Sequence, residues 1–278
     1  MNAAWIVNGR ESAVEPADRG LAYGDGLFET MARREGRIQW FDYHWQRLQT
    51  SCERLDIACP DRSVVSAEIA ALDPSSEDCV VKIIVTRGSS GRGYRPAQGA
   101  SPSRIISVSP WPNYPESRYL HGIRVCHCGT RLGENSALAG MKHLCRLEQV
   151  LAQREVEAAG VDEGLMRSSS GYVMSGTMSN LFLVKSNQLQ TPSLHLCGVA
   201  GVMRRAVIET AVSAGISVRK RLLSEREIAE ADELFLSNSV FGIWPVNAVG
   251  DKQYPIGPIT RMLMDKLRIP QNTRVLNA

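Results

Sequence analysis

Tyr23-Gly24-Asp25-Gly26-Leu27-Phe28-Glu29-Thr30-Met31-Ala32 runs from a glycine-punctuated turn into a strand, because residues 26–32 alternate as a half-buried strand does. Residues 80–86 alternate in the same way. Between these two segments, apolar residues recur at three- and four-residue steps over 43–55, which predicts one face of a helix. Residues 5–10 add a short strand that meets an Asn-Gly turn. The N-terminal part therefore mixes strands and a helix.

Three prolines within six residues, Pro110, Pro112 and Pro115, are incompatible with a continuing helix or a central strand. They predict a linker over 113–121, which separates a smaller N-terminal domain (1–112) from a larger C-terminal domain (122–278). In the second domain we expect strands at 123–128, 163–166, 181–184 and 233–236 and helices at 144–159 and 202–214. Ser224 and Glu227 have the spacing of a capping box. Strands and helices intermingle throughout, so the fold class is α/β or α+β.

Composition excludes several classes of protein. The 278 residues are 44% hydrophobic and 22% charged, with a net charge of only +3, which argues against a nucleic-acid partner. No apolar run approaches the roughly 20 residues that cross a bilayer, and no targeting leader is evident, so we expect a cytoplasmic protein without a membrane partner. The seven cysteines are scattered, which favours reduced thiols. Cys126-His127-Cys128 lies inside a predicted strand and lacks the paired spacing of a zinc site, so no metal is expected.

The chain holds six lysines against 26 arginines, and Lys142 stands out among the six. It lies in a nearly uncharged stretch, 137–144, where loss of hydration favours the neutral, nucleophilic amine that forms Schiff bases. The alternative is a lysine whose amine reaches water at the start of a helix. Lys82 is a rival, but alternation with Val81 and Ile83 lets it face solvent.

Three segments are candidates for binding an anion. Arg47 on the predicted helix suits a phosphate, although such an arginine is usually only solvated. Residues 198–204 form a glycine-bearing turn at a helix start, where free N–H groups attract anions, although many helices begin this way without a ligand. Ser237-Asn238-Ser239 offers hydroxyl groups and turn amides after a strand, and a structural role is equally compatible with it.

Taken together and in order, these segments resemble the class IV pyridoxal phosphate enzymes, the branched-chain and D-amino-acid aminotransferase-like family. The resemblance runs over nearly the whole chain. Its motifs are D-R-G at 18–20, Y-G-D-G-L-F-E-T at 23–30, H-x-x-R-L at 44–48, R-G-S-S-G-R-G-Y at 87–94, A-G-M-K-H-L-C-R-L-E-Q at 139–149, S-N-L-F at 179–182, G-V-M-R at 201–204 and P-V at 245–246. The motifs at 87–94 and 142–149 are more similar to aminodeoxychorismate lyases than to the transaminases.

The resemblance implies a two-domain fold, a homodimer and pyridoxal 5'-phosphate as cofactor, with a small molecule as substrate. Lys142 would hold the cofactor and transfer protons, with Thr30 as a proton donor or positioning group. The cofactor phosphate would be bound by Arg47, by the amides of Val202 and Met203, and by Ser239. Substrate contacts would come from Tyr23, Phe28, Arg92 and Tyr94, with Arg92 pairing with a carboxylate, although Arg92 is equally compatible with a solvent-facing loop.

One position departs from the family pattern. Ser175 stands where the family carries a glutamate, whose carboxylate keeps the pyridine nitrogen of the cofactor protonated. A serine offers a hydrogen bond but no negative charge. A lyase tolerates this loss better than a transaminase, because formation of an aromatic product drives the lyase reaction. A transaminase, and a cofactor-binding homologue whose activity has decayed, are the two alternatives.

Overall fold

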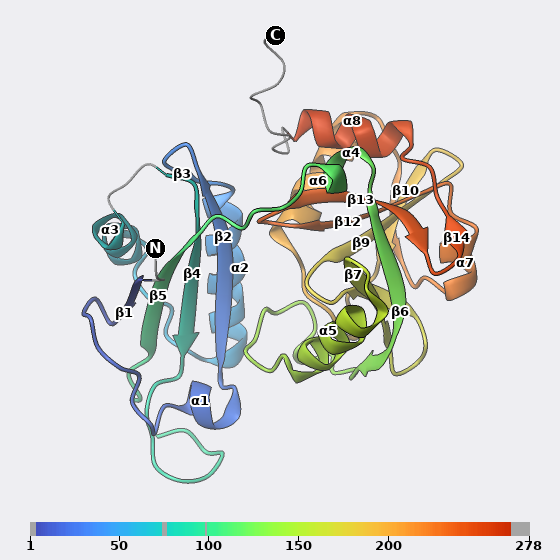
Figure 1. The fold of residues 1–278 in the computed structure, drawn as a ribbon. Helices are drawn as coiled ribbons and strands as arrows, with labels where there is room; N and C mark the ends of the chain where they lie inside the picture. The colour runs from blue at the N-terminus through green and yellow to red at the C-terminus, as the bar shows by residue number, and fades with distance from the viewer. Residues whose placement is uncertain (1–3, 74–76, 98, 268–278) are drawn as a thin grey trace. The chain divides into compact units, whose positions relative to one another are not determined.

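The computed structural model describes residues 4–73, 77–97 and 99–267, and the chain divides into two compact units (Figure 1). The first unit contains residues 1–113 and 141–145, and the second contains 114–140 and 146–278. The split near 113 falls beside the proline-rich segment. Residues 141–145 group with the first unit, whereas the sequence pattern predicts that they belong to the second domain. The predicted linker also contains a short helix, α4 (Ser117–Leu120).

The first unit is an antiparallel sheet with strand order β1-β5-β4-β2-β3. Its strands are β1 (Ala4–Val7), β2 (Gly26–Arg34), β3 (Arg37–Ile38), β4 (Cys79–Thr86) and β5 (Ser103–Pro110), and its helices are α1 (Arg19–Tyr23), α2 (Phe41–Leu55) and α3 (Arg62–Leu72). Helix α2 packs on β2, and α3 packs on β1 and β5. The alternation predicted for β2 and β4 is confirmed: Met31, Val81 and Val85 are fully buried in the core.

The second unit is a mixed sheet with strand order β11-β10-β9-β12-β13-β6-β7-β8, and β14 pairs with β13. Its strands are β6 (Ile123–Leu132), β7 (Glu163–Ser168), β8 (Val173–Gly176), β9 (Asn180–Lys185), β10 (Gln188–Pro192), β11 (Val218–Arg221), β12 (Glu233–Asn238), β13 (Gly242–Val249) and β14 (Lys252–Gln253). Besides α4, its helices are α5 (Leu147–Ala159), α6 (Val202–Ser213), α7 (Glu225–Ala229) and α8 (Pro258–Lys266). The capping box of Ser224 and Glu227 is confirmed at α7.

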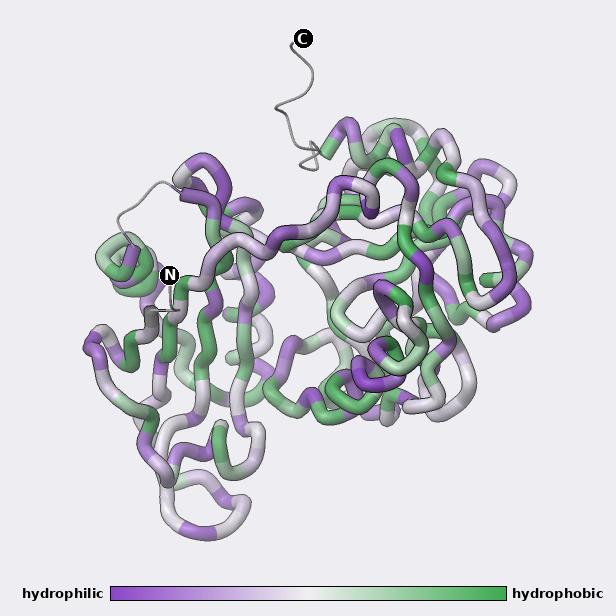
Figure 2. Tube along the Cα trace, viewed as in Figure 1, coloured by the Kyte–Doolittle hydropathy of each residue, from purple (hydrophilic) through white to green (hydrophobic). Residues whose placement is uncertain are grey.

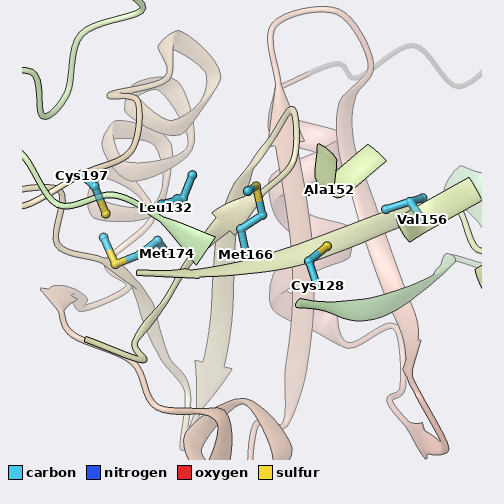
Figure 3. Close-up of a cluster of buried hydrophobic side chains, with 7 residues drawn as sticks. All are labelled: Cys128, Leu132, Ala152, Val156, Met166, Met174 and Cys197. Carbon is cyan, nitrogen blue, oxygen red and sulfur yellow. The ribbon is translucent and has the colours of Figure 1, made fainter. Parts of the chain in front are cut away.

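Buried apolar side chains hold α5 against the sheet of the second unit. Figure 3 shows one such cluster, drawn from β6, α5, β7, β8 and a loop: Cys128, Leu132, Ala152, Val156, Met166, Met174 and Cys197. The rings of Phe182 and Phe235, on the paired strands β9 and β12, stack 4.8 Å apart. In Figure 2 green stretches recur along the central strands of the first unit, whereas the loop after β4 is mostly pale or purple. Both units combine a sheet with helices, so the α/β or α+β class predicted from the sequence is confirmed.

Helix α5 begins later than the sequence predicts, at Leu147 instead of residue 144. The reason is tertiary: the backbone of residues 142–144 bonds to the start of β2 and does not take part in a helix. Phe28 N donates to Lys142 O at 2.9 Å, and Leu144 N donates to Gly26 O at 3.0 Å. These bonds bring a segment from the middle of the sequence into the first unit.

Candidate functional site

Lys142 is held against β2 through its own backbone. In addition to the hydrogen bonds that Lys142 and Leu144 make to β2, His143 forms a bridge with Leu27. A side chain at Gly26 would lie 2.6 Å from the Val85 carbonyl oxygen and 2.8 Å from Leu144, so this glycine permits the close approach. The Lys142 ammonium lies 4.2 Å from the centre of the Phe28 ring. The structure therefore brings the two sequence-predicted residues Lys142 and Phe28 together.

Thr30 and Lys82 lie on the same face of the sheet as Phe28. Thr30 follows Phe28 by two residues in β2, and it is the register partner of Lys82 in β4. The Lys82 ammonium lies 5.2 Å from the Phe28 ring. Lys82 does point away from the core formed by Val81 and Ile83, but it is half-buried against an aromatic ring and does not simply face solvent. Two ammonium groups thus contact one ring, within cation–π range.

Glu29 joins two residues of α2 on the other face. Its carboxylate accepts from Arg47 Nε at 2.8 Å and from a terminal nitrogen of Arg47 at 2.5 Å. His44 Nδ1 lies 2.6 Å from the same carboxylate. Glu29 and His44 are 2% and 1% exposed. The three side chains form a buried network that fixes the guanidinium plane of Arg47.

The charge state of this network follows from its burial and its partners. Burial by itself raises the pKa of Glu29, but the charge of Arg47 and the hydrogen bonds from His44 and Arg47 outweigh burial and hold that pKa at about 2. Burial lowers the pKa of His44 more than the Glu29 carboxylate raises it. His44 is therefore neutral near pH 7 and donates from Nδ1 to the ionised Glu29. Its Nε2 is buried without a hydrogen-bond partner within the described residues.

Arg19 organises the loop that carries the R-G-S-S-G-R-G-Y motif. It is almost fully buried, pairs with Asp25 at 2.8 Å, and donates to the carbonyl oxygens of Gly93 and Tyr94. Its guanidinium also lies 4.9 Å from the Tyr23 ring. Burial raises the pKa of Asp25, but Arg87 and Arg19 reverse the effect and keep that pKa below its ordinary value. Asp25 is thus an ionised anchor for this loop.

The predicted substrate residues of the loop are accessible. Tyr94 is 85% exposed, and its ring lies 5.4 Å from that of Tyr23. Arg92 is exposed as well. The structure therefore brings Tyr23 and Tyr94 together and leaves Arg92 on the loop surface, a position compatible with both interpretations of this arginine.

In the second unit, the N-terminus of α6 has no side-chain cap. Its N-cap residue is Gly201, where a Cβ would lie only 1.9 Å from Asn180 Oδ1. Asn180 in turn donates to the Val199 carbonyl oxygen at 2.9 Å. Glycine therefore permits the amides of Val202 and Met203 to follow a tight, side-chain-free turn, an arrangement that suits an anion.

Strand register places the turn after β12 beside this region. Ser237 of β12 pairs with Asn180 of β9. The next residue, Asn238, accepts hydrogen bonds from the amides of Val240 and Phe241, both at 2.9 Å, and so closes a tight turn that contains Ser239. In the second unit, Val202 and Met203 thus follow Gly201, which lies against Asn180, and Ser239 follows Ser237, which pairs with Asn180. All three residues are predicted from the sequence.

Ser175 is 8% exposed at the end of β8, and its hydroxyl donates to the Gly176 carbonyl oxygen at 2.7 Å. The loop after β8 is held by Glu163, which is fully buried. Its carboxylate accepts hydrogen bonds from Thr177 N, from Met178 N and from the Ser179 hydroxyl. The Glu163 carboxylate is thus occupied by hydrogen bonds from the loop, and Ser175 itself contributes no charge.

Several residues that shape these groups had no role assigned from the sequence. Glu29 had a detectable signal, since it is a carboxylate in the middle of an apolar alternating strand, where an unpaired charge is costly. The roles of His44, Arg19 and Asn180 depend on partners far away in the sequence, and no local pattern indicates them. Within the described residues, no group of three or more His, Cys, Asp or Glu side chains is arranged to hold a metal ion. In the same residues, no helix is both long enough and apolar enough to cross a membrane.

Comparison with known proteins places the chain among its relatives. Residues 26–249 match the family model for amino-transferase class IV. An aminodeoxychorismate lyase of Vibrio harveyi is 34% identical over 95% of this chain and 98% of its own length. The crystal structure of a 4-amino-4-deoxychorismate lyase from Pseudomonas aeruginosa is 48% identical, with a TM-score of 0.91 over 95% of this chain and 98% of that chain.

A crystal structure of the Escherichia coli branched-chain amino acid aminotransferase is more distant. It is 25% identical, with a TM-score of 0.86 over 94% of this chain and 92% of that chain. The family match covers most of the sequence, and the fold agrees over nearly its whole length. The chain therefore belongs to the aminotransferase class IV family.

Proposed function

We propose that this chain is a pyridoxal 5'-phosphate-dependent aminodeoxychorismate lyase, which converts 4-amino-4-deoxychorismate to 4-aminobenzoate and pyruvate in folate biosynthesis. The similarity to two named lyases supports the reaction class. The observation that carries the proposal is the placement of the Lys82 and Lys142 ammonium groups on the Phe28 ring. A carboxylate bound by Lys82 holds a substrate close to the nucleophilic amine of Lys142, which suits a substrate with two carboxylates.

The residues present fit the cofactor. The uncapped start of α6 supplies backbone donors for a phosphate, and the Gly201 position leaves no room for a side chain there. Glu29 holds the guanidinium of Arg47 in a fixed plane, which suits two-point recognition of phosphate oxygens. In this proposal Arg47, Val202, Met203 and Ser239 bind the phosphate, and Lys142 binds the cofactor covalently through Nζ. When bound, pyridoxal phosphate supplies an electron sink for the carbon next to the substrate amine.

The protein side chains then move the protons. Lys142 Nζ would be the base that removes the proton from the amine-bearing ring carbon. Thr30 Oγ1, on the Phe28 face of the sheet, delivers a proton to the departing enolpyruvyl group, which leaves as pyruvate. Lys82 and Arg92 bind the two carboxylates. Phe28, Tyr23 and Tyr94 provide the aromatic surface that orients the substrate ring.

Ser175 favours the lyase over a transaminase. A buried hydroxyl that donates to a backbone carbonyl provides no negative charge for a pyridine nitrogen. A lyase whose product is aromatic needs less help from the electron sink than a transaminase does. The decayed homologue is the alternative that Ser175 also favours, because the same substitution weakens every reaction on the ring.

We also infer a homodimer in the cytoplasm. The first turns of α5 expose the apolar side chains of Leu147, Val150 and Leu151, which are 78%, 56% and 49% exposed. An exposed apolar helix face of this kind favours a protein partner, and a second copy is the partner that the family resemblance implies. Sedimentation of the purified protein tests this, and a monomer at micromolar concentration would contradict it.

The central experiment combines trapping with product analysis. Borohydride reduction of the protein loaded with pyridoxal phosphate should tag the peptide that contains Lys142. The tag should be lost in Lys142→Ala and kept in Lys82→Ala. The loaded protein should release pyruvate and an aromatic amine from 4-amino-4-deoxychorismate without a 2-oxo acid acceptor. Rapid exchange of amino groups between a branched-chain amino acid or D-alanine and 2-oxoglutarate would instead support the transaminase. Trapping on Lys142 with no turnover in either assay would support the decayed homologue.

A further inference from the structure

A pair of thiols lies at the C-terminal end of α2, apart from the candidate cofactor and substrate residues. Helix α2 ends at Leu55, and its C-cap residue Asp56 has a left-handed backbone (φ 52°) that reverses the chain. Ile57 N donates to the Cys52 carbonyl oxygen at 2.9 Å, and the Ile57 side chain is buried. The chain therefore turns back along the last turn of the helix and carries Cys59 to Cys52.

The two thiols are in hydrogen-bonding contact and differ in exposure. Cys52 is fully buried, whereas Cys59 is partly exposed at the surface of the first unit. The contact shifts the pKa values of the two thiols in opposite directions. The hydrogen bond from Cys52 lowers the pKa of Cys59, although burial and Glu53 oppose this effect. The same hydrogen bond, together with burial, raises the pKa of Cys52. Cys59 is thus both the more accessible thiol and the better nucleophile.

We propose that Cys52 and Cys59 are a reversible modification site that reacts with peroxides and cycles between a dithiol and a disulfide. The Cys59 thiolate attacks a peroxide oxygen, so an S–O bond forms while the O–O bond breaks, and sulfur gives two electrons to the peroxide. The Cys52 sulfur then attacks the sulfenic acid. An S–S bond forms, the S–O bond breaks, and the hydroxyl group leaves as water with the proton of Cys52. With hydrogen peroxide, two thiols and one peroxide yield one disulfide and two waters, and a small dithiol reverses the change.

Within the described part of the chain, no other cysteine combines partial exposure, a lowered pKa and contact with a second thiol. Cys126 and Cys128 are also neighbours, but they are two residues apart on β6, and burial raises the pKa of both, that of Cys128 to about 12. Cys145 is exposed, and its thiol lies 3.8 Å from the carbonyl oxygens of Tyr23 and Gly24. It therefore serves as an internal comparison for accessibility without a thiol partner. The proposal is independent of the enzymatic function and of any cofactor.

The sequence provides a direct readout. Trypsin cuts after Arg47, Arg54 and Arg62, which separates peptide 48–54, with Cys52, from peptide 55–62, with Cys59. The full-length protein is treated with a stoichiometric amount of hydrogen peroxide, blocked with N-ethylmaleimide and digested without reductant. We expect the two peptides to appear as one linked species, lighter than their sum by two hydrogens. Dithiothreitol should restore both thiols.

Matched variants separate the steps. Cys145→Ser should leave the linked species unchanged. In Cys52→Ser the reaction should stop at a sulfenic acid on Cys59, which dimedone traps. In Cys59→Ser, a change at a partly exposed position, Cys52 should remain a thiol. The proposal is overturned if Cys145 is oxidised while both Cys52 and Cys59 are recovered as maleimide adducts, or if the link forms only in urea. A disulfide between either cysteine and a third residue would overturn it as well.

Discussion

Glu29 holds Arg47 by two parallel hydrogen bonds, from Nε to Oε1 at 2.8 Å and from a terminal nitrogen to Oε2 at 2.5 Å. This relationship connects strand β2, which also carries Phe28 and Thr30, to helix α2. It means that the arginine proposed to bind the cofactor phosphate is positioned by a buried carboxylate. Changes at Glu29 should therefore act on the cofactor through Arg47.

Glu29→Gln should weaken cofactor binding without unfolding the protein. The substitution keeps the side-chain size but removes the charge that fixes Arg47, and a hydrogen bond to a charged group contributes about 1.5–3 kcal/mol. We therefore expect the Kd for pyridoxal phosphate to rise by roughly 10- to 100-fold in a titration of the apoprotein followed by absorbance.

Glu68→Gln is the matched control for this change. Glu68 holds Arg104 by the same two-point geometry elsewhere in the first unit, at 2.6 and 2.5 Å. The Glu68→Gln variant should have slightly lower stability than the wild type and the same affinity for the cofactor. Equal losses of affinity in both variants would show that general destabilisation, and not the positioning of Arg47, is responsible.

His44 should make stability fall as the solution becomes acidic. Its pKa is depressed in the folded chain, so the unfolded chain binds the proton first, and the stabilisation present above about pH 6.5 is lost as pH falls. The slope for one proton is at most about 1.4 kcal/mol per pH unit. His44→Asn removes this titration and keeps an amide donor near Glu29, so its Tm should fall less between pH 7.5 and pH 5.5 than that of the wild type.

The exposed His195 provides a comparison, because His195→Asn should keep the wild-type pH profile. Glu29 makes stability depend on pH as well, but in a more acidic range than His44 does. Its pKa of about 2, against an ordinary value of 4.5, corresponds to roughly 3 kcal/mol that is present above about pH 4.5 and lost as pH falls toward 2. A pH profile for His44→Asn that coincides with the wild type above pH 5 would refute the assignment of a neutral buried His44.

Lys82→Met should impair substrate use more than cofactor binding. The variant keeps the aliphatic packing on Phe28 but removes the cation proposed to bind a carboxylate. We expect kcat/KM for 4-amino-4-deoxychorismate to fall by roughly 10- to 100-fold, as for the loss of a charged hydrogen bond. The trapping of cofactor on Lys142 should persist. Lys220→Met, at an exposed position, should behave as the wild type. An unchanged kcat/KM in Lys82→Met would remove Lys82 from the substrate site.

Ser175→Glu should strengthen the electron sink. It adds a negative charge at the position where the family resemblance implies a glutamate, and such a charge favours a protonated pyridine nitrogen. One pKa unit corresponds to about tenfold in the protonated fraction, so turnover should rise by about that factor. Ser175→Gln has nearly the same size without the charge and should not show this gain. If both variants keep the cofactor and neither is faster, ring protonation does not limit the reaction. Inactivity of both variants and of the wild type would favour the decayed homologue.

Features that depend on neighbouring residues could be predicted from the amino-acid sequence alone. Alternation over 26–32 and 80–86 predicts β2 and β4, because side chains of a strand point to opposite faces in turn. The apolar spacing over 43–55 predicts α2, and the spacing of Ser224 and Glu227 predicts the cap of α7, because both depend on contacts within one or two helical turns. The family motifs, taken in order, also pointed to Lys142 and Arg47.

Tertiary packing decides which of these residues are in contact. The pairing of residues 142–144 with the start of β2 delays the start of the expected helix to Leu147 and sets Lys142 on Phe28, and no local pattern encodes a contact between segments so far apart in the chain. The same holds for Lys82, which alternation directs away from the core but which a neighbouring strand covers with an aromatic ring. Glu29 is ionised in a buried strand because His44 and Arg47 reach it from α2. Burial and charge compensation are properties of the assembled fold, so they depend on packing and not on sequence spacing.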